Sequence, residues 1–174
     1  KGNDNHPYFS NKSNDEQQLI LVKTMLYENG LGLSDLPKGL VPFHAYKDFT
    51  ATAFEEHLHS AAKYLSINGV TKLHFTVAEG DKEKFEEEFE NIKERVEEAN
   101  HTKFEISYSN QDPKTDTIAV DKENNPFRDE DNRIFFRPGG HGALIENLNK
   151  QEADLIFVKN IDNVVVNTNL PKVV

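Results

Sequence analysis

The 174-residue chain contains no cysteine, no tryptophan and a single methionine. The absence of cysteine excludes disulfide bonds and catalysis by a thiol. The sequence has no run of about 18 apolar residues, so we expect no transmembrane helix. It also has no recognisable signal peptide, and we expect a cytoplasmic protein. Because the chain begins at Lys1 without a methionine, we expect it to be a piece of a longer protein.

Basic residues are scarce as well. The chain has 20 Lys and Arg but 30 Asp and Glu, which gives a net charge of −10. No basic stripe is visible, so nucleic acid is not an expected partner. An acidic protein that binds phosphates needs metal ions or local basic side chains to overcome charge repulsion. Apolar residues make up 36% of the chain and include twelve Phe, which supports the core of one domain over residues 1–174.

The residues that are present predict alternating helices and strands after a loose polar segment, residues 1–14. The expected helices have apolar residues at helical spacing; they span Asp15–Asn29, Thr52–Asn68, a stretch from Asp81 that includes Phe85, Phe89, Ile92, Val96 and Ala99, and His141–Asn149. The expected strands span Val41–Ala45, Lys72–Val77, Lys103–Ser109 and Leu155–Asn160. Ser13 and Glu16 have the spacing of a capping box before the first helix.

The order of these elements predicts the fold class. Strands that alternate with helices favour a parallel sheet covered on both sides. Leu155–Val158 is a continuous apolar run, which is typical of a central strand buried on both faces. The predicted fold is therefore α/β, a three-layer α/β/α arrangement around a mostly parallel sheet.

A polar stretch interrupts the alternation. Thr117–Val120 and Ile134–Phe136 are short apolar pieces on either side of a polar turn, Lys122–Asn132, which predicts a β-hairpin insertion. The acidic side chains in and before this turn either gather cations or simply keep a turn solvated, and the second interpretation is favoured. His57 and His59 are two residues apart on a helix and make a poor chelate, so we expect no zinc site. No internal repeat is apparent.

Glycines gather just before the last predicted helix, in Arg137-Pro138-Gly139-Gly140-His141-Gly142. Glycine lets a backbone come close to a ligand because no Cβ blocks the approach, and a helix start offers free N–H groups to a polar or anionic partner. Asp162 follows the last predicted strand, where open α/β sheets bind ligands. These features predict a nucleotide or phosphate site with a divalent metal. The alternatives are a plain glycine turn and an Asp162 that caps a turn. Arg137 either reaches a phosphate or lies at the surface.

Three motifs resemble those of the sugar nucleotidyltransferases, especially the uridylyltransferases that make UDP-sugars. They are Pro37-Lys38-Gly39-Leu40-x-Pro42, Pro138-Gly139-Gly140-His141-Gly142 and Ile161-Asp162-Asn163. Over nearly its whole length the chain also closely resembles a bacterial family known as domain of unknown function 4301, most strongly over residues 136–164. The resemblance to the transferases implies a fold of the nucleotide-diphospho-sugar transferase type.

The same resemblance implies roles for individual residues. Lys38 would contact a nucleotide or sugar phosphate, whose charge it offsets. Asp162 would bind Mg²⁺, a hard ion that prefers oxygen ligands, and Asn163 would help to hold that site. The residues that would lie against or beside the nucleotide base are Gln111, Gly139, Gly140, His141 and Gly142. The implied partners are a nucleotide or nucleotide sugar and a sugar phosphate.

The implied reaction is attack by a sugar 1-phosphate oxygen on the α-phosphorus of a nucleoside triphosphate, with release of pyrophosphate. One part of the transferase pattern is not seen, because residues 1–37 contain no Gly-x-Gly-Thr-Arg loop. Either this loop lies upstream in a longer chain or it has been lost. Three hypotheses follow. The chain is the first part of a sugar nucleotidyltransferase, or a non-catalytic nucleotide- or sugar-phosphate-binding module that has lost this loop, or a structural or interaction domain without a ligand.

Overall fold

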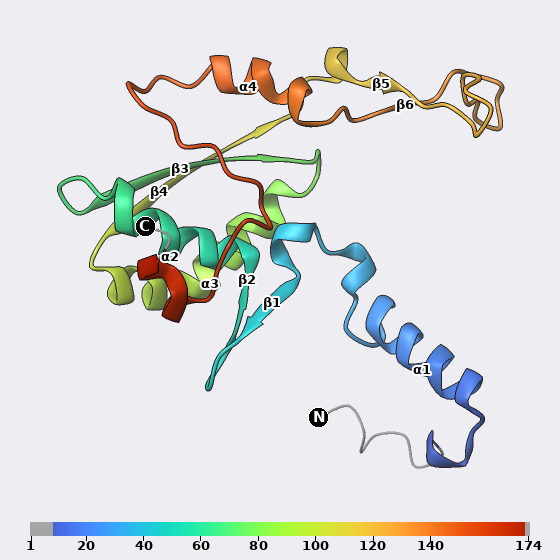
Figure 1. The fold of residues 1–174 in the computed structure, drawn as a ribbon, viewed down its shortest axis with the longest axis horizontal. Helices are drawn as coiled ribbons and strands as arrows, with labels where there is room; N and C mark the ends of the chain where they lie inside the picture. Colours follow the sequence, from blue (N-terminus) through green and yellow to red (C-terminus); the bar gives the residue numbers. More distant parts are fainter. Residues whose placement is uncertain (1–8, 173–174) are drawn as a thin grey trace. The chain divides into compact units, whose positions relative to one another are not determined.

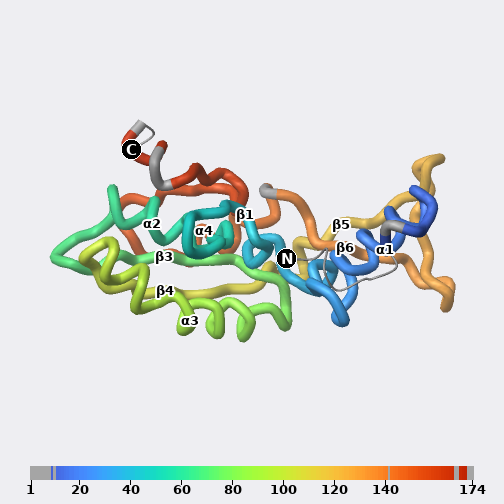
Figure 2. The backbone as a smooth tube through the Cα atoms, turned by 90° about the horizontal axis from the view of Figure 1, so that it is seen from below, coloured from blue at the N-terminus to red at the C-terminus, as the bar shows by residue number. Residues whose placement is uncertain are grey.

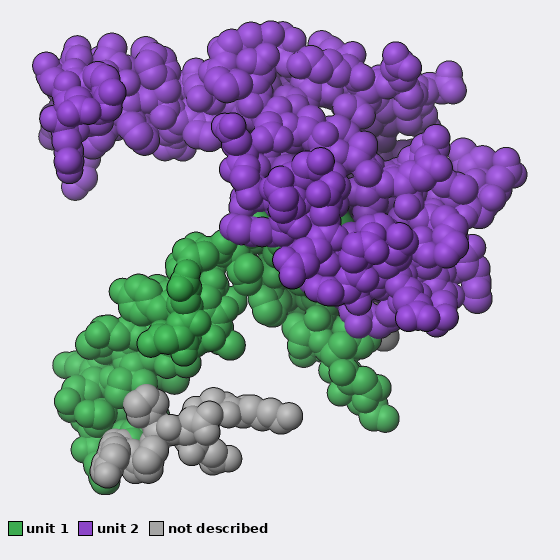
Figure 3. All heavy atoms as spheres, turned by 180° about the vertical axis from the view of Figure 1, so that it is seen from behind, with its two compact units in different colours: residues 1–54 green, residues 55–174 purple. Residues whose placement is uncertain are grey.

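The computed structural model describes residues 9–172 and divides the chain into two compact units, Lys1–Phe54 and Glu55–Val174 (Figure 3). Most of the segment predicted to be loose, residues 1–14, lies outside the described residues. Across the described residues, no helix combines the length and the apolar character needed to cross a membrane.

The first unit holds helix α1 (Asn14–Leu26) and an antiparallel pair of strands, β1 (Pro42–Ala45) and β2 (Thr50–Thr52) (Figure 1). The predicted capping box forms at the start of α1. The backbone N–H of Glu16 donates to Ser13 Oγ at 3.4 Å, and the N–H of Ser13 donates to Glu16 Oε2 at 2.9 Å. Strand β1 lies where the sequence predicts it. Strand β2 was not predicted; it ends at Thr52, so the second helix begins one residue later than predicted.

The second unit is built on a β3–α3–β4 crossover, which Figures 1 and 2 show from two directions. Strands β3 (Val70–Val77) and β4 (Lys103–Asn110) pair in parallel along their whole length, and α3 (Lys82–Asn100) connects them. The parallel pairing confirms the prediction from alternating elements. Phe75 of β3 and Tyr108 of β4 stack with ring centroids 6.2 Å apart on the face that meets the helices.

Helices α2 (Ala53–Leu65) and α3 cover that same face of the β3–β4 pair. The Phe75 ring lies 6.3 Å from Phe85 of α3 and 6.4 Å from the His57 ring of α2. The buried residues of α3 recur at helical spacing; they are Phe85, Phe89, Ile92, Val96 and Glu97. Ala99 was predicted to lie on the apolar face of this helix, but it is exposed.

The opposite face of the β3–β4 pair is polar. Because side chains alternate along a strand, this face carries Lys72, His74, Thr76, Glu105, Ser107 and Ser109. Helix α4 (Ile145–Asn149), which follows a 3-10 turn at His141–Leu144, lies on this side (Figure 1). Its Asn147 donates from Nδ2 to Ser109 Oγ at 2.8 Å and to the Asn110 carbonyl at 2.9 Å. The helical stretch predicted over His141–Asn149 is thus confirmed.

The sheet differs from the prediction in two ways. The described residues form three separate two-stranded sheets, of which β3–β4 is parallel and the other two are antiparallel. The predicted buried strand Leu155–Asn160 is wrong, because this segment is irregular and Leu155 and Val158 are each 72% exposed. The α/β class holds. The segment packs against α2 instead of joining β3 or β4.

The predicted hairpin insertion is confirmed, since β5 (Thr117–Ile118) pairs with the antiparallel β6 (Phe136–Arg137). In place of one polar turn, the excursion contains two turns with the same hydrogen bonds, eight residues apart. The Asp121 carboxylate accepts the N–H groups of residues 123 and 125, and the Asp129 carboxylate accepts those of residues 131 and 133. The chain therefore contains a short internal repeat that the sequence analysis missed, and these acidic side chains cap turns.

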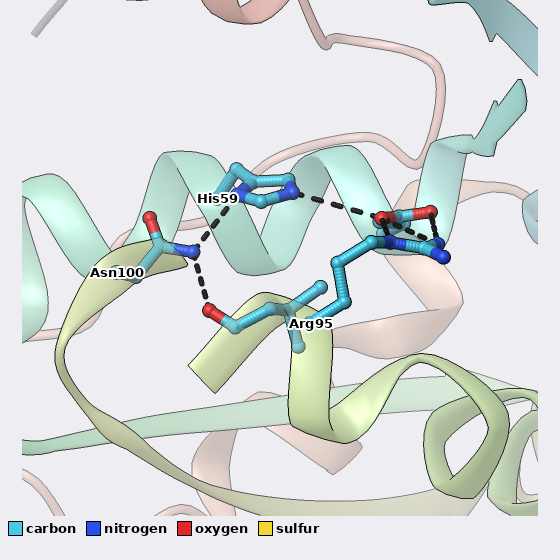
Figure 4. Close-up of polar contacts among 5 residues, drawn as sticks. His59, Arg95 and Asn100 are labelled. Atoms are coloured by element: carbon cyan, nitrogen blue, oxygen red, sulfur yellow. Dashed lines mark hydrogen bonds and ion pairs between the residues drawn. The ribbon is translucent and has the colours of Figure 1, made fainter. Parts of the chain in front are cut away.

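A polar network joins α2 to α3 (Figure 4). The Arg95 guanidinium donates to both carboxylate oxygens of Glu55, with N···O distances of 2.9–3.1 Å, although Glu55 is only 1% exposed. Asn100 Nδ2 donates to His59 Nδ1 at 2.8 Å and to the Val96 carbonyl at 2.7 Å. The His59 Nδ1 atom therefore accepts, and Nε2 on the other side of the ring lies 3.7 Å from the Glu55 carboxylate. This network gives His59 a structural role.

Candidate functional site

The glycine segment, residues 139–142, lies between β6 and α4, the helix whose Asn147 bonds to the last residue of β4. A Cβ at Gly139 would come within 2.9 Å of Ala143 Cβ and 3.0 Å of the Thr115 carbonyl oxygen, so the fold requires glycine there. A Cβ at Gly140 or Gly142 would meet no described atom within 4 Å. Both positions are exposed, and Gly140 has an ordinary φ of −76°. Packing and backbone strain therefore do not explain glycine at these two positions.

Two other predicted site residues contact the chain that follows β4. Gln111 follows the strand directly, and its Nε2 donates to Asp116 Oδ1 at 3.2 Å. Arg137 ends β6, paired with Thr117 across the hairpin, and is exposed. Gln111, Arg137 and Gly139 are thus each tied to the chain between residues 111 and 117, which follows β4. The side chain of His141 lies outside the part of the chain that the structure describes.

Asp162 and Asn163 lie in a turn that α2 holds. The N–H of Asn163 donates to the Asn160 carbonyl at 3.0 Å, which closes the turn. His57 Nε2 lies 3.1 Å from the Asn160 carbonyl oxygen and 3.0 Å from that of Ile161. Both partners are acceptors, so Nε2 carries the proton and donates. Burial lowers the pKa of His57, which keeps the ring neutral in this position.

Two further contacts hold the preceding residues against α2. The Phe157 and Tyr64 rings pack edge to face with centroids 5.2 Å apart. Lys159 Nζ donates to Ser60 Oγ at 3.1 Å and lies 5.3 Å from the centre of the Tyr64 ring. The three α2 residues follow helical spacing, at positions 57, 60 and 64, and form one stripe. Sequence reasoning missed this stripe because a histidine, a serine and a tyrosine do not form a recognisable apolar pattern.

A hollow of about 360 Å³ lies at this turn. It is lined by Ser60, Lys159, Asp162, Asn163, Val164 and Val165. Groups of three or more side chains suited to hold a metal are absent from the described residues. Mg²⁺ needs fewer protein ligands, because it commonly binds one or two carboxylates and completes its shell with water and phosphate oxygens. The exposed Asp162 carboxylate and the Asn163 amide oxygen fit that pattern.

Lys38 belongs to the first unit. It begins a 3-10 turn, Lys38–Leu40, in which Gly39 and Leu40 are buried while the lysine side chain is exposed. The glycine segment and the Asp162 turn belong to the second unit, where different elements hold them, β4 with its hairpin and α2 respectively. A single crevice that unites all three motifs stays a prediction.

A cluster that sequence reasoning missed lies on the polar face of the β3–β4 pair. His74 Nδ1 and Nε2 lie 2.8 Å from Ser107 Oγ and Ser109 Oγ respectively. The Ser107 hydroxyl donates to the Leu73 carbonyl at 3.3 Å, so its oxygen accepts from Nδ1 and leaves Nε2 to accept from Ser109. Burial lowers the pKa of His74, which favours this neutral form. The cluster presents polar groups next to α4, whose Asn147 bonds to Ser109.

The sequence model of the family described as "Domain of unknown function (DUF4301)" matches residues 2–174. The chain therefore belongs to this family. No curated protein and no solved structure matches the chain.

Proposed function

We propose that this member of the DUF4301 family binds a nucleotide or nucleotide sugar together with Mg²⁺, as part of a sugar nucleotidyltransferase. The observation that carries the proposal is the open backbone at Gly140 and Gly142, just before α4, whose Asn147 bonds to the last residue of β4. A flat base or sugar ring can approach that backbone without meeting a side chain. Ligands of open α/β sheets bind outside the carboxyl ends of parallel strands. The likeness of the three motifs to those of UDP-sugar enzymes supports the same proposal.

In this proposal Gln111 and the glycine segment contact the base, and Arg137 approaches a phosphate. Asp162 and Asn163 hold Mg²⁺, which would neutralise phosphate charge when bound. The transferase fold enters here as part of the proposal, with β3, α3 and β4 as one crossover of a larger sheet. Transfer would proceed by positioning and charge neutralisation without a covalent intermediate.

A second candidate is a non-catalytic module that binds the same ligands. It would use the same glycine segment and Asp162 turn, and residues 1–37 as given contain no Gly-x-Gly-Thr-Arg loop to grip a triphosphate. The two candidates differ in one measurable product. A transferase releases pyrophosphate from a nucleoside triphosphate and a sugar 1-phosphate, whereas the module binds nucleotide without turnover.

The test is calorimetric titration of the full-length natural protein with UTP and with a UDP-sugar, with and without Mg²⁺. Gly140→Ala and Gly142→Ala are expected to lower the affinity by about tenfold or more, which is about 1.4 kcal/mol, and to leave the melting temperature unchanged. Gly139→Ala is the matched control for packing. It should destabilise the fold by about 1–3 kcal/mol because its Cβ has no room. Failure of the folded wild-type protein to bind any nucleotide would refute the proposal, and unchanged affinity in both open-glycine variants would remove the glycine segment from it.

A further inference from the structure

We infer that Lys159 is a phosphate-binding residue, held in place by α2 at the rim of the hollow beside Asp162, an inference that rests on the proposed function. The resemblance to the transferases assigns Lys159 no role. Three features of the structure carry the inference: the make-up of the hollow, the contacts that hold the ammonium group, and the charge of the surrounding protein.

The hollow combines a cation with a carboxylate. Lys159 lines it together with Asp162, Asn163 and Ser60, and its volume of about 360 Å³ lies within the usual range for small-molecule pockets, about 300–1,000 Å³. A phosphate that shares a metal ion with Asp162 would bring its remaining negative oxygens into this hollow. The ammonium group is the complement that such oxygens need.

The ammonium group is held at a defined position. Ser60 is only 3% exposed, and its hydroxyl accepts one hydrogen bond from Lys159 Nζ at 3.1 Å. The Tyr64 ring lies under the cation at 5.3 Å and is itself packed against Phe157. An ammonium group has three donors, so the bond to Ser60 leaves donors that can reach an anion. Holding the side chain in advance reduces the entropy that a flexible lysine loses when it binds.

Charge explains why a local cation is needed here. The chain has a net charge of −10, which repels a phosphate before it reaches the site. Asp162 adds a negative charge at the hollow itself. Lys159 offsets part of this repulsion at short range. The competing explanation is that Lys159 only ties residues 155–161 to α2, in which case its removal changes stability and leaves anion affinity as it was.

The test uses the full-length protein, with UDP and with inorganic pyrophosphate as probes, each titrated with and without Mg²⁺. Lys159→Gln is expected to weaken both probes by about tenfold, as expected when one close charge-assisted contact is lost, and to make binding less sensitive to salt. Lys159→Arg should keep most of the affinity because it keeps the charge. Ser60→Ala should weaken binding by less than Lys159→Gln, since the cation remains but is held less firmly. Lys63→Gln, an exposed lysine on the same helix, is the control and should bind as the wild type does.

The outcomes separate this inference from the proposed function. Suppose that Lys159→Gln binds both probes as tightly as the wild type, while Gly142→Ala binds UDP more weakly. The inference is then overturned and the proposed function stands. If the wild type binds pyrophosphate through Lys159 but binds no nucleotide, the anion site stands and the proposed function fails. A lower melting temperature for Lys159→Gln with unchanged affinity would show a structural tether and would also overturn the inference.

Discussion

Two apolar stretches of the second unit end in opposite environments. Helix α3 buries Phe85, Phe89 and Val96 against the β3–β4 pair. The run Leu155–Val158 is at least as apolar, yet its outer residues, Leu155 and Val158, are each 72% exposed. Apolar composition alone therefore does not decide burial, because each stretch needs a surface that accepts its shape and its backbone polar groups.

Strand β4 and the segment that follows Leu155–Val158 differ in how their backbone groups are satisfied. Strand β4 gains a complete parallel ladder with β3. The carbonyl groups of Asn160 and Ile161 instead accept from the His57 side chain. A carbonyl needs a partner but does not require a strand to provide one. In α2, His57 donates to these carbonyl groups and the Tyr64 ring packs against Phe157, so the segment is held without joining a sheet.

The largest expected effect contrasts the two apolar stretches directly. Phe89→Ala should lower the free energy of unfolding by about 3–5 kcal/mol, because it leaves a cavity between α3 and Phe104. Leu155→Ala should change the free energy of unfolding by less than about 0.5 kcal/mol, since that side chain is already exposed. Urea denaturation followed by circular dichroism measures both. Equal losses in the two variants would show that Leu155 is buried in solution.

An intermediate effect is expected where α2 holds the Asp162 turn. His57→Leu removes the donor to two carbonyl groups and should lower the free energy of unfolding by about 1–2 kcal/mol. Hydrogen–deuterium exchange should become faster over residues 157–163 and stay unchanged in β3 and β4. His57→Gln, which can still donate, is the matched variant and should restore part of the protection. Unchanged exchange in His57→Leu would mean that the turn is held by other contacts.

The smallest expected effect is a dependence of stability on pH. Burial lowers the pKa of His57 and of His74 below the ordinary value of 6.5. Each folded-state pKa lies below the unfolded one, so the stability from the neutral rings is fully present above about pH 6.5 and is lost as the pH falls through the folded-state pKa. The melting temperature should therefore fall between about pH 7 and pH 5.

Carboxylates act in a separate and more acidic range. Backbone hydrogen bonding from Asn125 lowers the pKa of Asp121 below its ordinary value of 3.8, so the stability from this group is lost only at more acidic pH. In a variant with both His57→Gln and His74→Gln, the melting temperature should accordingly change less between pH 7 and pH 5. Its fall at more acidic pH should be the same as in the wild type. An equally steep profile in that variant would assign the dependence to other groups.

The sequence by itself determined the elements whose signals are local. Helical spacing of Phe residues predicted α3, period-two alternation predicted β3 and β4, and Ser13 with Glu16 predicted the cap of α1. It also predicted that residues 139–142 bend ahead of a helix and that a hairpin interrupts the fold. In each case the sequence pattern lies within the element that it predicts or a few residues from it. The element can therefore be predicted without knowing what packs against it.

Only the tertiary structure decided which partners those elements meet. It placed Leu155–Asn160 along α2 and outside the sheet, and it brought Lys159 to Ser60, 99 residues away in the sequence. It also showed that Gly139 is required by packing whereas Gly140 is not. The reason is physical. Whether an apolar segment is buried depends on whether a complementary surface lies next to it. That surface is assembled from parts of the chain that are far away in the sequence.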